Sequence, residues 1–353
     1  MEQTPQNQDW SFGDSDLKRF EEYRITDMTD VPLPKDVLTI SGSTIAVNGD
    51  IFTISGESKG GKSAVMGMCI SGVITTTGVV NDGLDGMQIL PNNDRHAVIH
   101  FDTEQARHKH KYNVQTIIRR AELSTCPDHF LSYNIRKLNI DDYQEKTTGI
   151  CDAAYKKFGG IHSIWIDGGA DYVTDVNDQE RSNEVISYFE HLAIEYDTAV
   201  FLVVHTNPGS NKERGHFGSQ CQRKSGGILR VKSSGDQSIV EGDFLRYTGK
   251  QNLSQLSFKY DTEKGYHVGC GSVSVDVKEG LKANEKREKA ARICKEVFGS
   301  QKSYKYDEAL KKIGAVRSCS ERTAKTDFSL MRVNDMIIQG SDNRWRLNNE
   351  YFS

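Results

Sequence analysis

Residues 56–63, Gly-Glu-Ser-Lys-Gly-Gly-Lys-Ser, decide the fold because they match the phosphate-binding pattern G-x-x-x-x-G-K-[ST] without a gap. In this pattern the glycines let backbone N–H groups approach phosphate oxygens, the lysine supplies a positive charge, and the serine supplies a hydroxyl for magnesium. The apolar residues 51–55 predict a buried strand before the motif, and apolar spacing from Ser63 onward predicts a helix after it. The N-terminus of that helix would also attract phosphate.

We therefore expect this loop to bind ATP together with Mg²⁺. The alternative is a chance match in a surface loop, and the flanking strand and helix argue against it. The predicted nucleotide-binding residues are Gly56, Glu57, Ser58, Lys59, Gly60, Gly61, Lys62, Ser63 and Ala64.

The composition describes an ordinary globular chain, with 36% hydrophobic and 27% charged residues, and a length of 353 residues favours two domains. Residues 1–10 are polar and contain no signal-peptide core, and the weakly charged run 65–80 is broken by glycines and threonines. Seven widely spaced cysteines without a C-x-x-C pair suit reduced thiols and argue against a zinc site. We expect a cytoplasmic protein that does not contact a membrane.

The net charge of −4 is distributed unevenly along the chain. Residues 281–353 contain 16 Lys/Arg and 10 Asp/Glu, which leaves 29 and 39 in residues 1–280, and all six prolines lie before residue 209. The change in character predicts a boundary near Gly280, with residues 279–282 as a short linker. We expect an N-terminal arm over residues 1–40, packed on a neighbouring subunit or on its own body, then an ATPase domain over 41–279 and a basic domain over 280–353.

Downstream of the motif, strand-like apolar runs alternate with helix-length segments, which is typical of an α/β fold with a mostly parallel sheet. Ligands of such sheets bind beyond the carboxyl ends of the strands. The expected strands are residues 97–101, 163–167 and 199–204, and the expected helices are 105–123, 141–158 and 180–196. Polar residues follow or end these strands and should gather around Lys62: Asp102, Glu104, Asp167 and His205.

Each of these polar residues suits a role in hydrolysis. Asp167 fits the acidic partner that, with Ser63, holds the magnesium shell. Glu104 could polarise the attacking water as a general base, and His205 could sense the γ-phosphate. The alternatives are that the carboxylates cap helices and that the histidine is a hydrogen-bonded structural residue.

At these residues the chain resembles the RecA-like ATPases, and within them the hexameric replicative helicases and their RepA-like plasmid and mobile-element relatives. The resemblance rests on the motif at 56–63, on the strand ends 100–104 (HFDTE) and 164–167 (IWID), and on 201–207 (FLVVHTN) followed by a glycine-rich loop into 217–219 (FGS); it covers about residues 40–277. It implies a RecA-like core in which the glutamate is the catalytic base, the aspartate holds magnesium and a polar residue senses γ-phosphate. It also implies a homo-oligomer, such as a hexamer.

In that family an arginine from the neighbouring subunit completes the ATP site and stabilises charge on the transferring phosphoryl group. The spacing here departs from the family pattern, so Arg223, Arg230 and Arg246 compete for this role, and any of them can instead be a solvated surface residue.

The segment 207–220 (NPGSNKERGHFGSQ) has no aliphatic anchor, and its composition predicts mobility until something negative binds it. The corresponding loop of RecA-like motors grips single-stranded nucleic acid, which makes Lys212 and Arg214 candidate contacts to single-stranded DNA. A disordered lid over the nucleotide is the alternative.

The basic C-terminal region predicts helices over residues 284–298, 306–313 and 320–334, then a hairpin of 336–339 and 344–347. In the third helix Ala324, Phe328 and Met331 recur at helical spacing and should face the core, which leaves the opposite side polar. This stretch resembles winged-helix domains, which implies contact with duplex DNA or docking of a protein. The predicted DNA-binding residues here are Arg322, Lys325 and Arg332 on the helix and Arg344 and Arg346 on the wing.

The sequence leaves three function classes. The first is a DNA-stimulated, ring-forming ATPase motor that resembles replicative helicases of plasmids or mobile elements. The second is an ATP-controlled DNA-binding switch that recruits other proteins without unwinding. The third, a P-loop kinase, is disfavoured because the placement of Glu104 suits attack by water.

Overall fold

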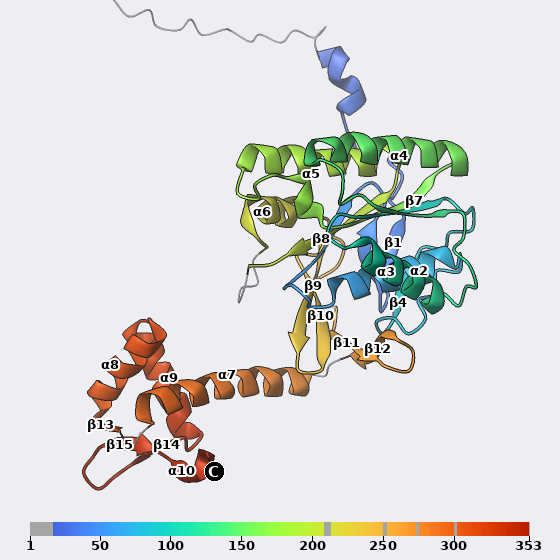
Figure 1. The fold of residues 1–353 in the computed structure, drawn as a ribbon. Helices are drawn as coiled ribbons and strands as arrows, with labels where there is room; N and C mark the ends of the chain where they lie inside the picture. The colour runs from blue at the N-terminus through green and yellow to red at the C-terminus, as the bar shows by residue number, and fades with distance from the viewer. Residues whose placement is uncertain (1–16, 208–212, 250–252, 273–274, 300–301, 353) are drawn as a thin grey trace, which may run out of the picture.

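The computed structural model describes residues 17–207, 213–249, 253–272, 275–299 and 302–352. A large α/β body is followed by a small C-terminal domain, and the long helix α7 (Val275–Phe298) leads from one to the other (Figure 1). Within the described ranges, no helix is both long and apolar enough to cross a lipid bilayer.

A large sheet forms the centre of the body, with nine strands among the described residues in the order β12-β11-β10-β9-β3-β8-β7-β5-β6. The strands from β9 to β6 in this order run parallel, and β10, β11 and β12 extend the sheet with antiparallel pairing. The predicted α/β fold with a mostly parallel sheet is therefore confirmed. The strand bounds are β3 Ile51–Gly56, β5 Ala97–Asp102, β6 Phe130–Asn134, β7 Ile161–Asp167, β8 Ala199–His205, β9 Ile228–Ser234, β10 Gln237–Asp243, β11 Leu256–Asp261 and β12 Tyr266–Ser272.

Helices cover both faces of the sheet, which explains why its central strands are continuous apolar runs. Alternate residues of one strand enter different cores: Phe52 and Ile54 pack with α2 on one face, whereas Ile51 packs with α5 on the other. Figure 1 shows α4 and α5 together on the second face. The helix bounds are α2 Lys62–Ile74, α3 Arg107–Arg120, α4 Tyr143–Phe158, α5 Gln179–Glu195 and α6 Gly215–Lys224, with short 3-10 turns at η1 Lys18–Tyr23, η2 Ile140–Asp142 and η3 Gly169–Tyr172.

A smaller sheet of β2 (Ser43–Val47), β1 (Asp36–Ile40) and β4 (Met87–Ile89) packs beside α2. Val37, Leu38 and Ile40 are buried in the same core as α2. The N-terminal arm is therefore shorter than the predicted residues 1–40, because its last residues belong to the body. Before β1, a run of apolar side chains is more than half exposed: Leu17, Phe20, Tyr23, Ile25, Met28, Val31 and Leu33.

The C-terminal domain packs helices against a small antiparallel sheet of β13, β15 and β14. Its core buries Ala324, Phe328 and Met331, as predicted. The linker expected at residues 279–282 is instead helical and lies inside α7, because this stretch has no proline and is rich in good helix formers. The bounds are β13 Ser303–Tyr304, α8 Tyr306–Arg317, α9 Glu321–Val333, β14 Ile337–Gln339, β15 Trp345–Leu347 and α10 Asn349–Phe352.

Candidate functional site

The motif loop, residues 56–63, connects the carboxyl end of β3 to the N-terminus of α2. Gly61 has a φ of +100°, and a Cβ at this position would lie 2.7 Å from Cζ of Phe258. Only glycine therefore fits without strain. The loop places the positive end of a helix dipole where residues 58–64 line a cavity, an arrangement that suits an anion.

Lys62 is buried beneath this loop and is held by the loop itself. Its Nζ donates to Gly56 O at 3.0 Å and Glu57 O at 2.8 Å, and it lies 3.2 Å from His205 Nδ1. Burial lowers the pKa of Lys62, and the nearby carboxylates of Glu104 and Asp167 oppose that shift. Gly56 and Glu57 thus contribute to the site through their backbone carbonyl oxygens, which accept hydrogen bonds from Lys62.

His205 joins Lys62 to Glu104 in one hydrogen-bonded chain. An ammonium group only donates, so Nδ1 of His205 must accept, which assigns the ring proton to Nε2. Nε2 lies 3.1 Å from Glu104 Oε1, which accepts that proton's hydrogen bond. The start of α2, the turn after β5 and the end of β8 therefore meet through the side chains of Lys62, Glu104 and His205, which the sequence predicted to lie together.

Ser63 and Asp167 form a second contact across the strand ends. Ser63 Oγ donates to Asp167 Oδ2 at 2.8 Å. Burial raises the pKa of Asp167 to about 7; the Ser63 hydrogen bond opposes the shift, while the carboxylates of Asp102 and Glu104 add to it. A buried carboxylate among other carboxylates is stabilised by a nearby cation.

The donor set of Ser63 and Asp167 fits Mg²⁺, a hard cation that takes one or two protein oxygens and completes its shell with water and substrate phosphate. In the described part of the chain, no group of three or more His, Cys, Asp or Glu side chains is arranged to hold a metal ion.

Asp102 does not face the motif loop, contrary to expectation. Its Oδ1 accepts from the backbone N–H groups of Glu104 at 3.0 Å and Gln105 at 2.8 Å, and its Oδ2 lies 2.7 Å from His110 Nδ1. Asp102 thus fixes the turn that carries Glu104. Sequence reasoning missed His110, because its position on α3 beneath this turn depends on how the helix packs.

The cavity beside the motif loop has a volume of about 610 Å³ and extends from the Lys62 region to an aromatic wall. Tyr112 of α3 and Tyr260, Tyr266 and His267 of the β11–β12 hairpin line it. Tyr112 Oη donates to Gly265 O at 3.2 Å, which ties α3 to the hairpin. Flat rings beside an anion site are suited to stacking against a planar heterocycle. No spacing pattern in the sequence predicts this wall, because β11 and β12 are remote from the motif along the chain.

The candidate arginines do not reach Glu104 in the same chain. Arg230 is 2% exposed and its Nη2 lies 3.1 Å from Glu213 Oε1 and 3.0 Å from Asp243 Oδ2, so it is a buried structural cation. Arg246 donates to Arg223 O and lies near Asp50, which precedes β3. Arg223 and Arg246 therefore lie near the amino end of β3, whereas the motif loop follows its carboxyl end.

Of the segment predicted as a mobile loop, residues 207 and 213–220 belong to the described part of the chain. The described residues show that α6 starts at Gly215, and Phe217 is fully buried and anchors it. Exposed Arg214 donates its backbone N–H to His205 O at 3.0 Å, next to the Lys62–His205–Glu104 chain. Lys212 lies outside the described residues.

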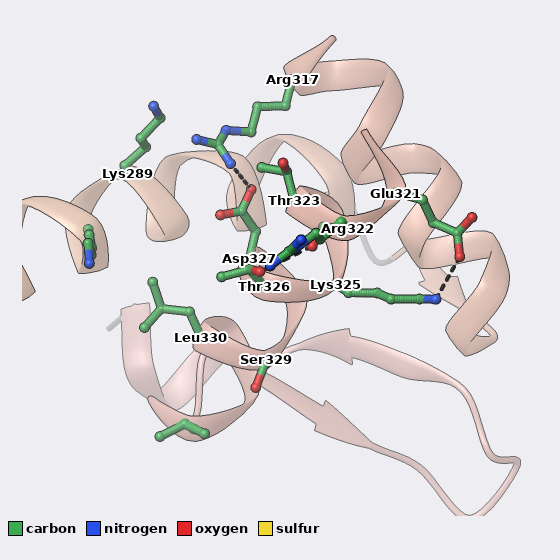
Figure 2. Close-up of a pocket in the computed structure, with 12 residues that line it drawn as sticks. Lys289, Arg317, Glu321, Arg322, Thr323, Lys325, Thr326, Asp327, Ser329 and Leu330 are labelled. Atoms are coloured by element: carbon green, nitrogen blue, oxygen red, sulfur yellow. Dashed lines mark hydrogen bonds and ion pairs between the residues drawn. The ribbon is translucent and has the colours of Figure 1, made fainter. Parts of the chain in front are cut away.

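The predicted basic residues of the C-terminal domain differ in their surroundings. Lys325 Nζ pairs with Glu321 at 2.7 Å, and Arg346 Nη2 pairs with Asp342 at 3.2 Å. Arg344 Nη1 donates to Ser303 O at 3.3 Å. Arg322 and Arg332 are exposed, and Figure 2 shows Arg322 in a groove along α9 that Arg332 does not line.

Neither a protein-family model nor a curated protein matches this chain. The function of this chain is therefore inferred from the chemistry of its site.

Proposed function

We propose that this protein is a Mg²⁺-dependent, RecA-like P-loop ATPase that acts on DNA as a ring-forming motor. The observation that carries the proposal is the 2.8 Å hydrogen bond between Ser63 and Asp167. It joins the hydroxyl of a phosphate-loop motif to a carboxylate at the end of another strand, which is the pair that P-loop NTPases use to hold Mg²⁺.

The proposed reaction is attack of water on the γ-phosphorus of ATP. Glu104 accepts the proton of the attacking water, the bond from the γ-phosphorus to the β–γ bridging oxygen breaks, and ADP and phosphate are the products. Lys62 would stabilise the negative charge of the β- and γ-phosphates, and Ser63 and Asp167 would hold Mg²⁺, which would supply further positive charge to the phosphates. His205, bonded to both Lys62 and Glu104, is the residue that links phosphate binding to the base.

The aromatic wall supports a nucleotide over inorganic phosphate as the ligand. A base that stacks on Tyr260 or His267 would leave its phosphates in reach of residues 58–64, because both sets of residues line one cavity.

Two observations support an assembly. The exposed apolar run between Leu17 and Leu33 is the kind of surface that a partner covers. Arg223 and Arg246 lie at the other end of β3 from the motif loop, so either could complete only a neighbour's site, whereas Arg230 is held by its buried pairing with Glu213. We propose a homo-oligomer in which one of the two exposed arginines acts in trans. The basic C-terminal domain, which we propose to be a winged helix, would bind duplex DNA.

The test is the ATPase rate with and without single-stranded DNA, measured beside the mass in solution, with Lys62→Ala as the matched control for contaminating activity. Strong stimulation and a mass several times that of the 39.6 kDa chain would support the motor. Slow, unstimulated hydrolysis with duplex binding would instead support an ATP-controlled switch. A wild-type rate equal to that of Lys62→Ala would overturn the proposal.

A further inference from the structure

The C-terminal domain contains a groove of about 1230 Å³ between α7 and α9. Lys286 and Lys289 line it from α7, and Arg317 lines it from the end of α8. Arg322 and Lys325 line it from α9 (Figure 2). Cations from separate helices therefore converge on one concave surface.

The charges in this groove do not cancel. Its acidic residues, Glu321 and Asp327, are each matched by a cation: Lys325 pairs with Glu321 at 2.7 Å, and Arg317 pairs with Asp327. Figure 2 shows both pairs. Lys286, Lys289 and Arg322 remain as surplus charge, and none of the three has an ion pair in the part of the chain that the structure describes.

The other lining residues favour nucleic acid over protein. Ser329 and Thr326 supply hydroxyls, whereas the apolar lining comes from Leu330 and Val333 near the end of α9. Lysine is depleted in protein–protein interfaces, whereas lysine, arginine and hydroxyl side chains make most phosphate contacts in protein–DNA complexes. Of the hairpin arginines, Arg346 pairs with Asp342, and Arg344 donates to the carbonyl oxygen of Ser303.

We propose that the α7–α9 groove holds the phosphate backbone of duplex DNA, with Lys286 and Lys289 of α7 and Arg322 of α9 as the phosphate contacts. This inference rests on the proposed binding of DNA and assigns part of it to α7, the helix that leads out of the ATPase body. Contacts of this kind set register and affinity without reading sequence.

The test is the salt dependence of duplex binding by the full chain, using a mixed-sequence duplex longer than the protein's footprint. Each phosphate contact contributes about 0.9 to the slope of log K against log salt, so Lys286→Ala/Lys289→Ala should lower the slope by about 2. Alanine keeps α7 helical. Lys312→Ala, an exposed lysine of α8 outside the groove, is the matched control and should leave the slope unchanged.

The outcomes separate the two proposals. Loss of slope in the double variant, with equal weakening for duplexes of different sequence and an unchanged ATPase rate, supports the groove. If the wild-type chain binds duplex DNA and the double variant shows the same salt slope, the groove proposal is wrong while the proposed binding of DNA stands. An acidic protein segment would then be the better candidate ligand of the groove. Absence of duplex binding by the wild-type chain overturns both.

Discussion

Replacing Glu104 by glutamine isolates the role of one carboxylate. Glutamine keeps an oxygen that can accept from His205 Nε2, now 3.1 Å from Glu104 Oε1, and the backbone N–H of residue 104 keeps its bond to Asp102 at 3.0 Å. The turn should therefore stay in place while the proton acceptor is lost. A general base contributes about 10²–10⁴-fold, so kcat should fall by that factor, equivalent to about 3–5 kcal/mol in the barrier.

Nucleotide affinity should not weaken in the same variant. Glu104 adds negative charge beside the proposed phosphate site and helps to raise the pKa of Asp167, so its removal favours phosphate and Mg²⁺. Phosphate release and equilibrium binding of a fluorescent ATP analogue should be measured on one preparation. Glu195→Gln, an exposed carboxylate at the end of α5, is the matched control. A Glu104→Gln protein with normal turnover would refute the assignment of the base.

Lys62→Ala should abolish turnover in the phosphate-release assay, and retention of DNA binding would show that the variant is folded. Gly61→Ala should lose nucleotide binding, because the added Cβ would clash with the ring of Phe258. Gly42→Ala is its control: Gly42 has a φ of +76° and no atom within 4 Å of an added Cβ, so this variant should lose only about 1–2 kcal/mol of stability from the left-handed backbone. Equal nucleotide binding by the two variants would contradict the prediction. Arg230→Ala should destabilise the body by about 3–5 kcal/mol in urea unfolding, because it removes the guanidinium that pairs with the fully buried carboxylate of Glu213. A stable Arg230→Ala protein that has lost only ATPase activity would restore Arg230 as the arginine acting in trans.

The sequence was sufficient for the central strands and for most of the site. A strand buried on both faces is a continuous apolar run, and the polar residue that ends it must lie at the ligand edge of a parallel sheet. That logic placed Glu104, Asp167 and His205 near Lys62, where the hydrogen bonds bring them together. The same pattern does not predict whether the side chain of Asp102 contacts the motif loop or α3, because both follow from how α3 packs against the sheet. In the structure Asp102 contacts His110 of α3.

The sequence was insufficient where long-range packing decides the outcome. The β11–β12 hairpin meets α3 through contacts such as Tyr112 with Gly265, which no local pattern encodes. Arg230 was indistinguishable from a surface arginine until Glu213 and Asp243 were seen around it. The prediction of a linker near Gly280 was wrong for a local reason. One glycine destabilises a helix by only about 1 kcal/mol, so the helix-forming residues on both sides continue α7 through Gly280.

The bonds of Lys62 to its own loop have a consequence for selectivity. A ligand that draws Nζ toward itself must replace the carbonyls of Gly56 and Glu57 and the imidazole of His205 together. A weakly charged ligand, or one too short to reach Nζ, cannot compensate for the loss of these acceptors. In the proposed ATPase, Lys62 would therefore favour a ligand that carries charge at the third phosphate position. When such a ligand bound Nζ, Nδ1 of His205 would lose its donor, and the hydrogen bond to Glu104 would be affected by the same event. Substrate length would then be sensed by an exchange of hydrogen bonds at a single side chain.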